Sequence, residues 1–185
     1  MFLCVATVAA FIYFPFRIFE PDCFISSFNI VSSLNQTSNN NSTSNNYNPT
    51  IKIPFTVVFL NHDMYGLTYT DIDFTMSVFV DENTTRQIGR VTITDFYQWG
   101  GNMEGNPFPL RSYIETRGGE LNGVAKVGGK MYFRIDLSTR VKYSMFYIYM
   151  KHKRFWGGAN VAVDDFGMTD DEIYIPLGHS PAVIE

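Results

Sequence analysis

Cysteine is scarce in this chain of 185 residues. The sequence contains only Cys4 and Cys23, both near its start, so everything after residue 23 has no disulfide and no thiolate metal ligand. Small secreted scaffolds rely on several cross-links in place of a large core. The sequence therefore excludes a disulfide-rich scaffold.

Charge is also sparse, since Asp, Glu, Lys and Arg make up 17% of the residues and the net charge is -4. Nucleic-acid binding relies on clustered Lys and Arg, so we expect no nucleic-acid partner. His62, His152 and His179 have no ligand spacing such as H-x-x-x-H, and no serine sits in a nucleophile elbow. We accordingly expect no metal, no cofactor and no catalytic activity.

Aromatic residues are plentiful, with 17 Phe and 11 Tyr, and they favour strands. Apolar and polar residues alternate over 51–59 and again over 67–80, which predicts two half-buried strands. Further strands are expected near 89–93, 110–116, 124–127, 131–137, 141–149 and 159–163. Glycine pairs at 100–101, 118–119, 128–129 and 157–158 are typical of turns between them. This spacing predicts an all-β sandwich or barrel.

The first 16 residues carry no charged side chain, and Arg17 is the first. A helix of that length spans roughly 24 Å, and Ile18 and Phe19 extend it if Arg17 snorkels. We predict a transmembrane or signal anchor over 1–19. A cleaved signal peptide and a buried apolar strand or helix are the alternatives.

Composition divides the rest of the chain into three parts. Residues 20–49 are predicted to form a polar Asn/Ser-rich linker, 50–168 the β-domain, and 169–185 an acidic C-terminal tail. Within that tail, 173–175 could add an edge strand. Four positions fit the glycosylation pattern: Asn35, Asn40, Asn41 and Asn83. Their use would place everything after the anchor on the luminal or extracellular side.

Two clusters interleave aromatic side chains with polar or basic ones, at 96–99 and 151–156. Such clusters can bind lipid headgroups or sugars. The candidate contact residues are Trp99, Lys151, Lys153, Arg154 and Trp156. The alternative is structural: the rings close the ends of the core, and the charges of a strand end point into water.

Carboxylates suggest a third class of function, a secreted hydrolase. Such an enzyme would need two acidic side chains about 5–10 Å apart. The candidates are Asp71, Asp73, Asp164 and Asp165.

The order of features resembles a known plan: an apolar segment, a juncture from Arg17 to Pro21, a polar spacer and an alternating strand that ends at Asn61-His62-Asp63. Tyr69, then Gly89 leading to Phe96-Tyr97-Gln98, and the segments 129–135 and 141–143 follow in the same order. The chain resembles the plant late-embryogenesis-abundant type-two domain over roughly residues 17–166, in its membrane-anchored NDR/HIN-like form. It departs from that family in lacking the proline of an Asn-Pro-Asn turn and a late cysteine.

The resemblance implies an Ig/fibronectin-III-like antiparallel β-sandwich behind an N-terminal membrane anchor. It implies a single-pass protein of the plasma membrane, with the folded domain extracellular and without catalytic residues. The expected role is in plant defence or stress responses. The expected partners are the lipid bilayer and a cell-wall or membrane-protein component.

Overall fold

The computed structural model describes residues 20–30, 50–81, 84–101, 104–122, 124, 126–145, 148–164 and 173–175. Over these residues the chain is almost entirely β-structure, with one short 3-10 helix, η1 (Gly118–Leu121). No helix in this part is long and apolar enough to cross a bilayer, and the predicted anchor at 1–19 lies outside it.

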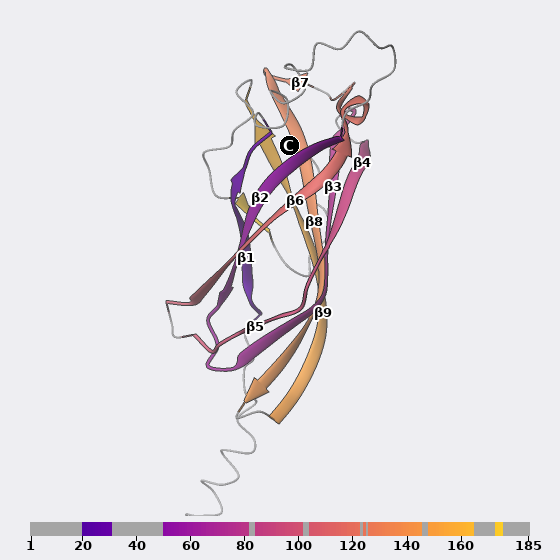
Figure 1. Ribbon diagram of the computed structural model, residues 1–185. Coiled ribbons are helices and arrows are strands. Elements are labelled where there is room, and N and C mark those ends of the chain that lie inside the picture. Colours follow the sequence, from indigo (N-terminus) through magenta and orange to yellow (C-terminus); the bar gives the residue numbers. More distant parts are fainter. Residues whose placement is uncertain are drawn as a thin grey trace, which may run out of the picture.

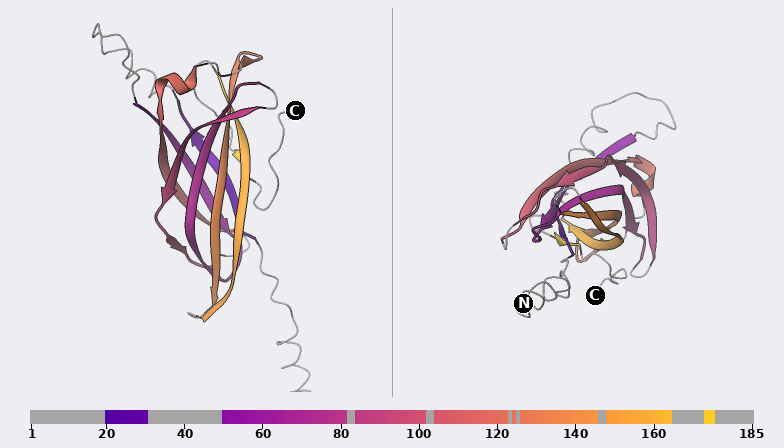
Figure 2. Two further views of the ribbon diagram at one scale, coloured as in Figure 1. Left: turned by 90° about the vertical axis from the view of Figure 1, so that its right-hand side faces the viewer. Right: turned by 90° about the horizontal axis from the view of Figure 1, so that it is seen from below.

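The strands form two antiparallel sheets that enclose one core (Figures 1 and 2). The first sheet has the order β10 (Ile173–Tyr174), β1 (Asp22–Phe28), β2 (Thr50–Asn61) and β6 (Asn106–Arg117). In the second, β3 (Gly66–Phe79) pairs with β4 (Thr85–Ile93) and β5 (Phe96–Gln98) on one side and with β8 (Lys130–Met145) on the other. The short β7 (Lys126–Val127) and the long β9 (Ile148–Val163) also pair with β8. The prediction of an all-β sandwich is confirmed.

Aromatic rings from the two sheets meet in the core. Phe55 of β2 lies 5.2 Å from Phe74 of β3 between ring centroids, in an edge-to-face arrangement. Phe28 of β1 lies 5.4 Å from Phe133 of β8. Edge-to-face and tilted pairs are the favoured geometries of aromatic rings, and they explain why this sandwich uses so much phenylalanine.

The predicted alternation is confirmed in the first sheet, where β2 buries Ile51, Ile53, Phe55, Val57 and Phe59. In β3 the buried positions change phase between Tyr69 and Ile72. A bulge lies at this point, and Asp71 has φ 52°, a left-handed conformation that aspartate tolerates better than most residues. The extra residue keeps both halves of the strand facing the core.

Two glycine pairs differ in their roles. Gly128 and Gly129 form the predicted hairpin turn between β7 and β8, with φ of 60° and 81°, as a type I′ turn requires. Gly157 and Gly158 were predicted to be a turn, which is wrong: they lie inside β9, opposite Leu137 and Asp136 of β8. A Cβ at Gly158 would overlap the carboxylate of Asp136 and the guanidinium of Arg134, so packing, not chain reversal, explains this glycine.

The prediction of a linker over residues 20–49 is wrong for the first part of this range. Asp22–Phe28 form β1, paired with β2, and Cys23 and Ile25 are fully buried. Burial raises the pKa of the Cys23 thiol well above its usual range, so this thiol is kept protonated. The apolar residues of this stretch do not alternate with polar ones, since Cys23, Phe24 and Ile25 are consecutive, so the strand had no clear period-2 signal. At the other end, the edge strand predicted at 173–175 is confirmed as β10.

The strands predicted at 131–137 and 141–149 differ in extent from those in the structure. Residues Lys130–Met145 form one strand, β8, and Ile148 already belongs to β9. The basic cluster at 151–156 therefore lies within a long strand and not at a strand end.

Candidate functional site

One end of the sandwich carries the motifs at 61–63 and 96–99 that the sequence singled out. Here β1 begins, β2 ends and β3 starts, and Asp22 pairs with Leu60. We call this the entry end, formed by Glu20–Asp22, the loop 62–65 and the loop residues 99–101 and 104–105. In Figure 1, β5 and the ends of β8 and β9 lie toward it, at the bottom of the view.

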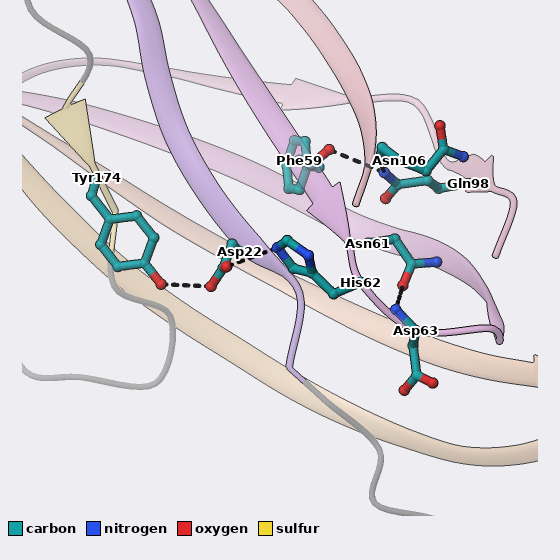
Figure 3. Close-up of polar contacts among 8 residues, drawn as sticks. All are labelled: Asp22, Phe59, Asn61, His62, Asp63, Gln98, Asn106 and Tyr174. Atoms are coloured by element: carbon teal, nitrogen blue, oxygen red, sulfur yellow. Dashed lines mark hydrogen bonds and ion pairs between the residues drawn. The ribbon is translucent and has the colours of Figure 1, made fainter. Parts of the chain in front are cut away.

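Ionic contacts fasten β1 at the entry end. His62 Nε2 lies 3.1 Å from a carboxylate oxygen of Asp22, whose other oxygen accepts a hydrogen bond from the Tyr174 hydroxyl at 2.7 Å (Figure 3). Burial, together with the bond to Asp22, raises the pKa of Tyr174 to about 12. Lys153 Nζ on β9 lies 2.9 Å from Glu20 Oε1. The first residues of β1 are thus tied to both sheets.

Asn61 is the centre of a buried polar network beneath the loops. Its side-chain amide donates to the carbonyl oxygens of Tyr65 at 2.8 Å and Trp99 at 3.0 Å. Its side-chain oxygen accepts the backbone N–H of Asp63 at 2.9 Å, which closes an Asx turn. One buried side chain therefore holds both the loop that follows it and Trp99, 38 residues further along the chain.

Gln98 completes this network from β5. Its amide nitrogen donates to the carbonyl oxygen of Phe59 at 3.0 Å (Figure 3) and to that of Asn106. Its oxygen accepts the Tyr69 hydroxyl at 3.0 Å. Burial raises the pKa of Tyr69, so the hydroxyl stays a donor. Asn61 and Gln98 belong to two of the motifs that carry the family resemblance. The structure brings those motifs together as one scaffold that positions the loops.

The backbone of the second loop lies very close to that of the first. The N–H of Gly101 donates to the carbonyl oxygen of Asp63 at 2.6 Å. A Cβ at Gly101 would overlap the carbonyl oxygen of Asn61. The glycine predicted here as a turn residue is needed because two backbones approach closely.

The scaffold displays apolar side chains to solvent. Met64 is 82% exposed, Trp99 is 65% exposed and Tyr97 is 40% exposed. The rings of Tyr97 and Trp99 meet edge to face at 5.0 Å. Phe96 points the other way and stacks between Tyr69 and Phe108, at 4.6 and 4.2 Å. Phe96 and Gln98 therefore help to close the core, whereas Tyr97 and Trp99 are exposed, and ligand contact by these two rings stays a prediction.

A basic row continues this surface across the second sheet. Tyr97 lies opposite Thr68, Thr68 opposite Lys142, and Lys142 opposite His152. In the next row Arg140 lies opposite Arg154. Arg140 pairs with Asp71 at 3.3 Å, whereas Lys142 and Arg154 have no ion-pair partner among the described residues. We call Met64, Tyr97, Trp99, Lys142, His152 and Arg154 the contact surface.

The residues predicted to contact lipid or sugar do not all lie on the same side of the structure. Trp99 and Arg154 belong to the contact surface, and Trp156 is exposed on β9 two residues beyond Arg154. Lys153 points to the other side of β9, where it pairs with Glu20. Lys151 lies in β9 opposite Tyr143, and its side chain is outside the described part. The four predicted glycosylation sites, Asn35, Asn40, Asn41 and Asn83, also lie outside the described residues.

Sequence reasoning missed Met64, Lys142 and His152 as surface contacts. Met64 follows Asp63 in a turn, where an apolar side chain is unusual, and this was the available signal. The other two join the surface only through cross-strand pairing with Thr68 and with each other. Such register is not readable from a single strand.

The hydrolase candidates do not form one acidic group. Asp164 follows the end of β9, whereas Asp71 and Asp73 lie beside the middle of β8, roughly 25 Å away at about 3.3 Å per residue. Hydrogen bonds from Arg90 and Thr92 lower the pKa of Asp73 and so favour its ionised form. Asp165 lies outside the described residues. Over the described part of the chain, no three His, Cys, Asp or Glu side chains are grouped to hold a metal ion.

Asp73 should contribute to the acid sensitivity of the fold. Arg90 Nη2 lies 2.6 Å from its carboxylate, and Thr92 donates to it at 2.6 Å. Because the folded-state pKa is lowered, the stabilisation is present above the unfolded-state pKa of about 3.9 and is lost as the pH falls through the folded value. Asp73→Asn should therefore reduce the denaturation midpoint at pH 7 and flatten its decline below about pH 4. The effect is modest, because Arg90 is 59% exposed.

The measurement is the urea midpoint as a function of pH. Thr92→Val is the matched control, since it removes one of the hydrogen bonds and keeps the carboxylate. Unchanged acid dependence in Asp73→Asn would contradict the assignment of this pair.

Comparisons with known proteins add little to this geometry. No protein-family model matches the sequence, and no curated protein matches it either. A solved structure described as the crystal structure of a protein from Archaeoglobus fulgidus is similar at 8% identity and a TM-score of 0.34, over 65% of this chain and 91% of that chain. The function must therefore be argued from the residues of this chain.

Proposed function

We propose that this chain is a non-enzymatic, membrane-anchored β-sandwich protein of the NDR/HIN-like type, with an Ig/fibronectin-III-like topology. Its folded domain lies on the extracellular side of the plasma membrane, held there by a single span over residues 1–19. Its role is in plant defence or stress responses, through contact with the bilayer and with a cell-wall or membrane-protein partner.

The observation that carries this proposal is the place where the apolar segment joins the sandwich. Glu20 follows that segment directly, and it is fixed at the entry end by Lys153. The same end displays Met64, Tyr97 and Trp99. A segment of 16 uncharged residues leading into an end with exposed aromatic rings is the arrangement expected of a domain that stands on a membrane.

The buried network supports the family part of the proposal. Asn61 and Gln98 belong to two of the motifs that carry the resemblance, and each donates hydrogen bonds to backbone carbonyl oxygens beneath the loops. The histidine between Asn61 and Asp63, where the family carries proline, has its own role here as the partner of Asp22.

Topology mapping of the full chain tests the proposal. In plant microsomes the protein should remain in the membrane fraction after carbonate extraction. Mass spectrometry should show that the mature protein still contains residues 1–19. Glycosidase treatment should remove its sugar and increase its mobility on a gel. A variant with Asn35, Asn40, Asn41 and Asn83 all changed to Gln should show no glycosidase shift, and it serves as the matched control. A soluble, unglycosylated product in the cytosol would rule out this topology, and loss of residues 1–19 would replace the anchor with a signal peptide.

A carbohydrate-binding module is the second candidate, favoured by one observation. Tyr97 and Trp99 present exposed ring surface beside polar loop groups, as sugar-stacking sites do. Titration with cell-wall polysaccharides should then change tryptophan fluorescence, and Trp99→Ala should abolish that change. No response to any polysaccharide would remove this candidate.

A further inference from the structure

We infer that the contact surface rests on the phospholipid headgroups of the membrane that holds the anchor. In this arrangement Met64, Tyr97 and Trp99 enter the interface, and Lys142, His152 and Arg154 meet lipid phosphates. This inference rests on the proposed anchor and adds to it a fixed orientation of the sandwich. The entry end faces the bilayer, and η1 and the β7–β8 turn face away.

The first support is where exposed apolar side chains gather. Six large apolar side chains are exposed in the described part of the chain: Met64, Tyr97, Trp99, Tyr113, Trp156 and Tyr174. Met64 and Trp99 belong to the two loops of the entry end, and Tyr97 lies in the adjoining β5, where its ring contacts that of Trp99. A cluster of this kind on a soluble surface usually marks an interaction site.

The second support is the rigidity of the loops beneath these side chains. The carbonyl oxygen of Trp99 accepts hydrogen bonds from both Asn61, at 3.0 Å, and Asn106, at 3.2 Å. The loop that carries Met64 is closed by the bonds from Asn61 to Tyr65 and from Asp63 to Asn61. A buried network that fixes exposed aromatic rings in advance lowers the entropic cost of binding.

The third support is distance along the chain. Only residues 17–21 separate the uncharged segment from β1, and five extended residues reach at most about 18 Å. A sandwich anchored by that segment must hold its entry end close to the headgroups. Such tethering raises the effective concentration of lipid at this surface without any strong intrinsic affinity.

Charge agrees with the same orientation. The acidic residues beside the junction already have partners: Glu20 pairs with Lys153, and Asp22 accepts a hydrogen bond from the Tyr174 hydroxyl and lies 3.1 Å from His62 Nε2. The neighbouring basic side chains Lys142 and Arg154 have no such partner among the described residues. Phosphate oxygens of lipids would supply the missing counter-charge. Tryptophan and tyrosine prefer this same depth, between hydrocarbon and water.

The two tryptophans make the inference testable, because Trp99 lies in the contact surface and Trp156 lies further along β9. Two single-tryptophan variants of the full chain are used: Trp156→Phe, which leaves Trp99, and Trp99→Phe, which leaves Trp156. Each variant is reconstituted into phosphatidylcholine vesicles with and without phosphatidylserine. Both changes should preserve the fold, since each side chain is about half exposed or more and the network uses only the carbonyl of Trp99. Lipid brominated near the headgroup should quench Trp99 several-fold more than Trp156. Lys142→Glu should weaken that quenching most in the phosphatidylserine vesicles.

Flotation of the vesicles tests the membrane anchor separately from the orientation of the sandwich. Protein that floats with the vesicles while Trp99 remains unquenched would overturn the orientation and leave the anchor intact. Protein that does not float would overturn both. If the fluorescence of Trp99 shows a shielded ring in detergent solution without lipid, the surface would instead bind the chain's own apolar segment. If Trp99 fluorescence responds to polysaccharide but not to vesicles, the surface would bind sugar. Either result would refute the lipid contact.

Discussion

Replacing Gly101 with alanine is expected to lower the free energy of unfolding by about 3 kcal/mol. The added Cβ would overlap the carbonyl oxygen of Asn61 and lie 3.0 Å from the backbone nitrogen of Asn106. Both neighbours are backbone atoms fixed by strand pairing, so they cannot move aside as a flexible side chain would. The N–H of Gly101 would also be displaced from the carbonyl oxygen of Asp63.

Urea denaturation of the purified chain measures this effect. Gly128→Asn is the matched control, because Gly128 has open space around it and a left-handed φ that asparagine accepts in a type I′ turn. That control should stay within about 0.5 kcal/mol of the wild type. Equal stability of Gly101→Ala and the control would contradict the close approach of the two loops. Loss of the loop geometry should also remove the selective quenching of Trp99 by lipid.

Replacing Gln98 with leucine should cost about 2–3 kcal/mol, although the side chains are similar in size. Gln98 is almost fully buried and bonds three partners: the hydroxyl of Tyr69 and the carbonyl oxygens of Phe59 and Asn106. Leucine would leave all three without that bond in a site that water does not reach. A buried polar group without a partner costs more than the net value of the bond it lost.

A double-mutant cycle isolates the bond between Gln98 and Tyr69. Tyr69→Phe alone should cost about 1–2 kcal/mol, and the double variant should be more stable than the sum of the single losses predicts, by about 1 kcal/mol. Gln87→Leu, on an exposed position of β4, is the control for the chemical change and should be near neutral. Strict additivity of Gln98→Leu and Tyr69→Phe would show that the two side chains do not interact.

These two experiments also bear on how the family resemblance should be understood. The motifs at 61–63 and 96–98 supply hydrogen bonds to the backbone of neighbouring segments. They hold two loops and a strand in one arrangement. We expect disruption of this network to affect stability and the display of Trp99 together, because the same bonds serve both.

Local patterns in the sequence determined the β-structure and much of its core. Alternation over 51–59 and 67–80 predicts the inward faces of β2 and β3, because side chains of a strand point to opposite faces with a period of two. Gly128 and Gly129 predict their hairpin because two adjacent left-handed residues are a local requirement. These features need no knowledge of which strands are neighbours.

The tertiary structure decided everything that depends on pairing across the chain. Gly158 serves packing against Asp136, and Gly101 serves the approach of two loops, so neither glycine could be interpreted from its own segment. Lys153 and Arg154 are adjacent in sequence, yet one pairs with Glu20 inside the entry end and the other joins the contact surface. Strand register decides which face of β9 is turned toward the first sheet. It also decides which residues of β8 lie in the same row as Tyr97. Register is set by long-range burial and not by local composition.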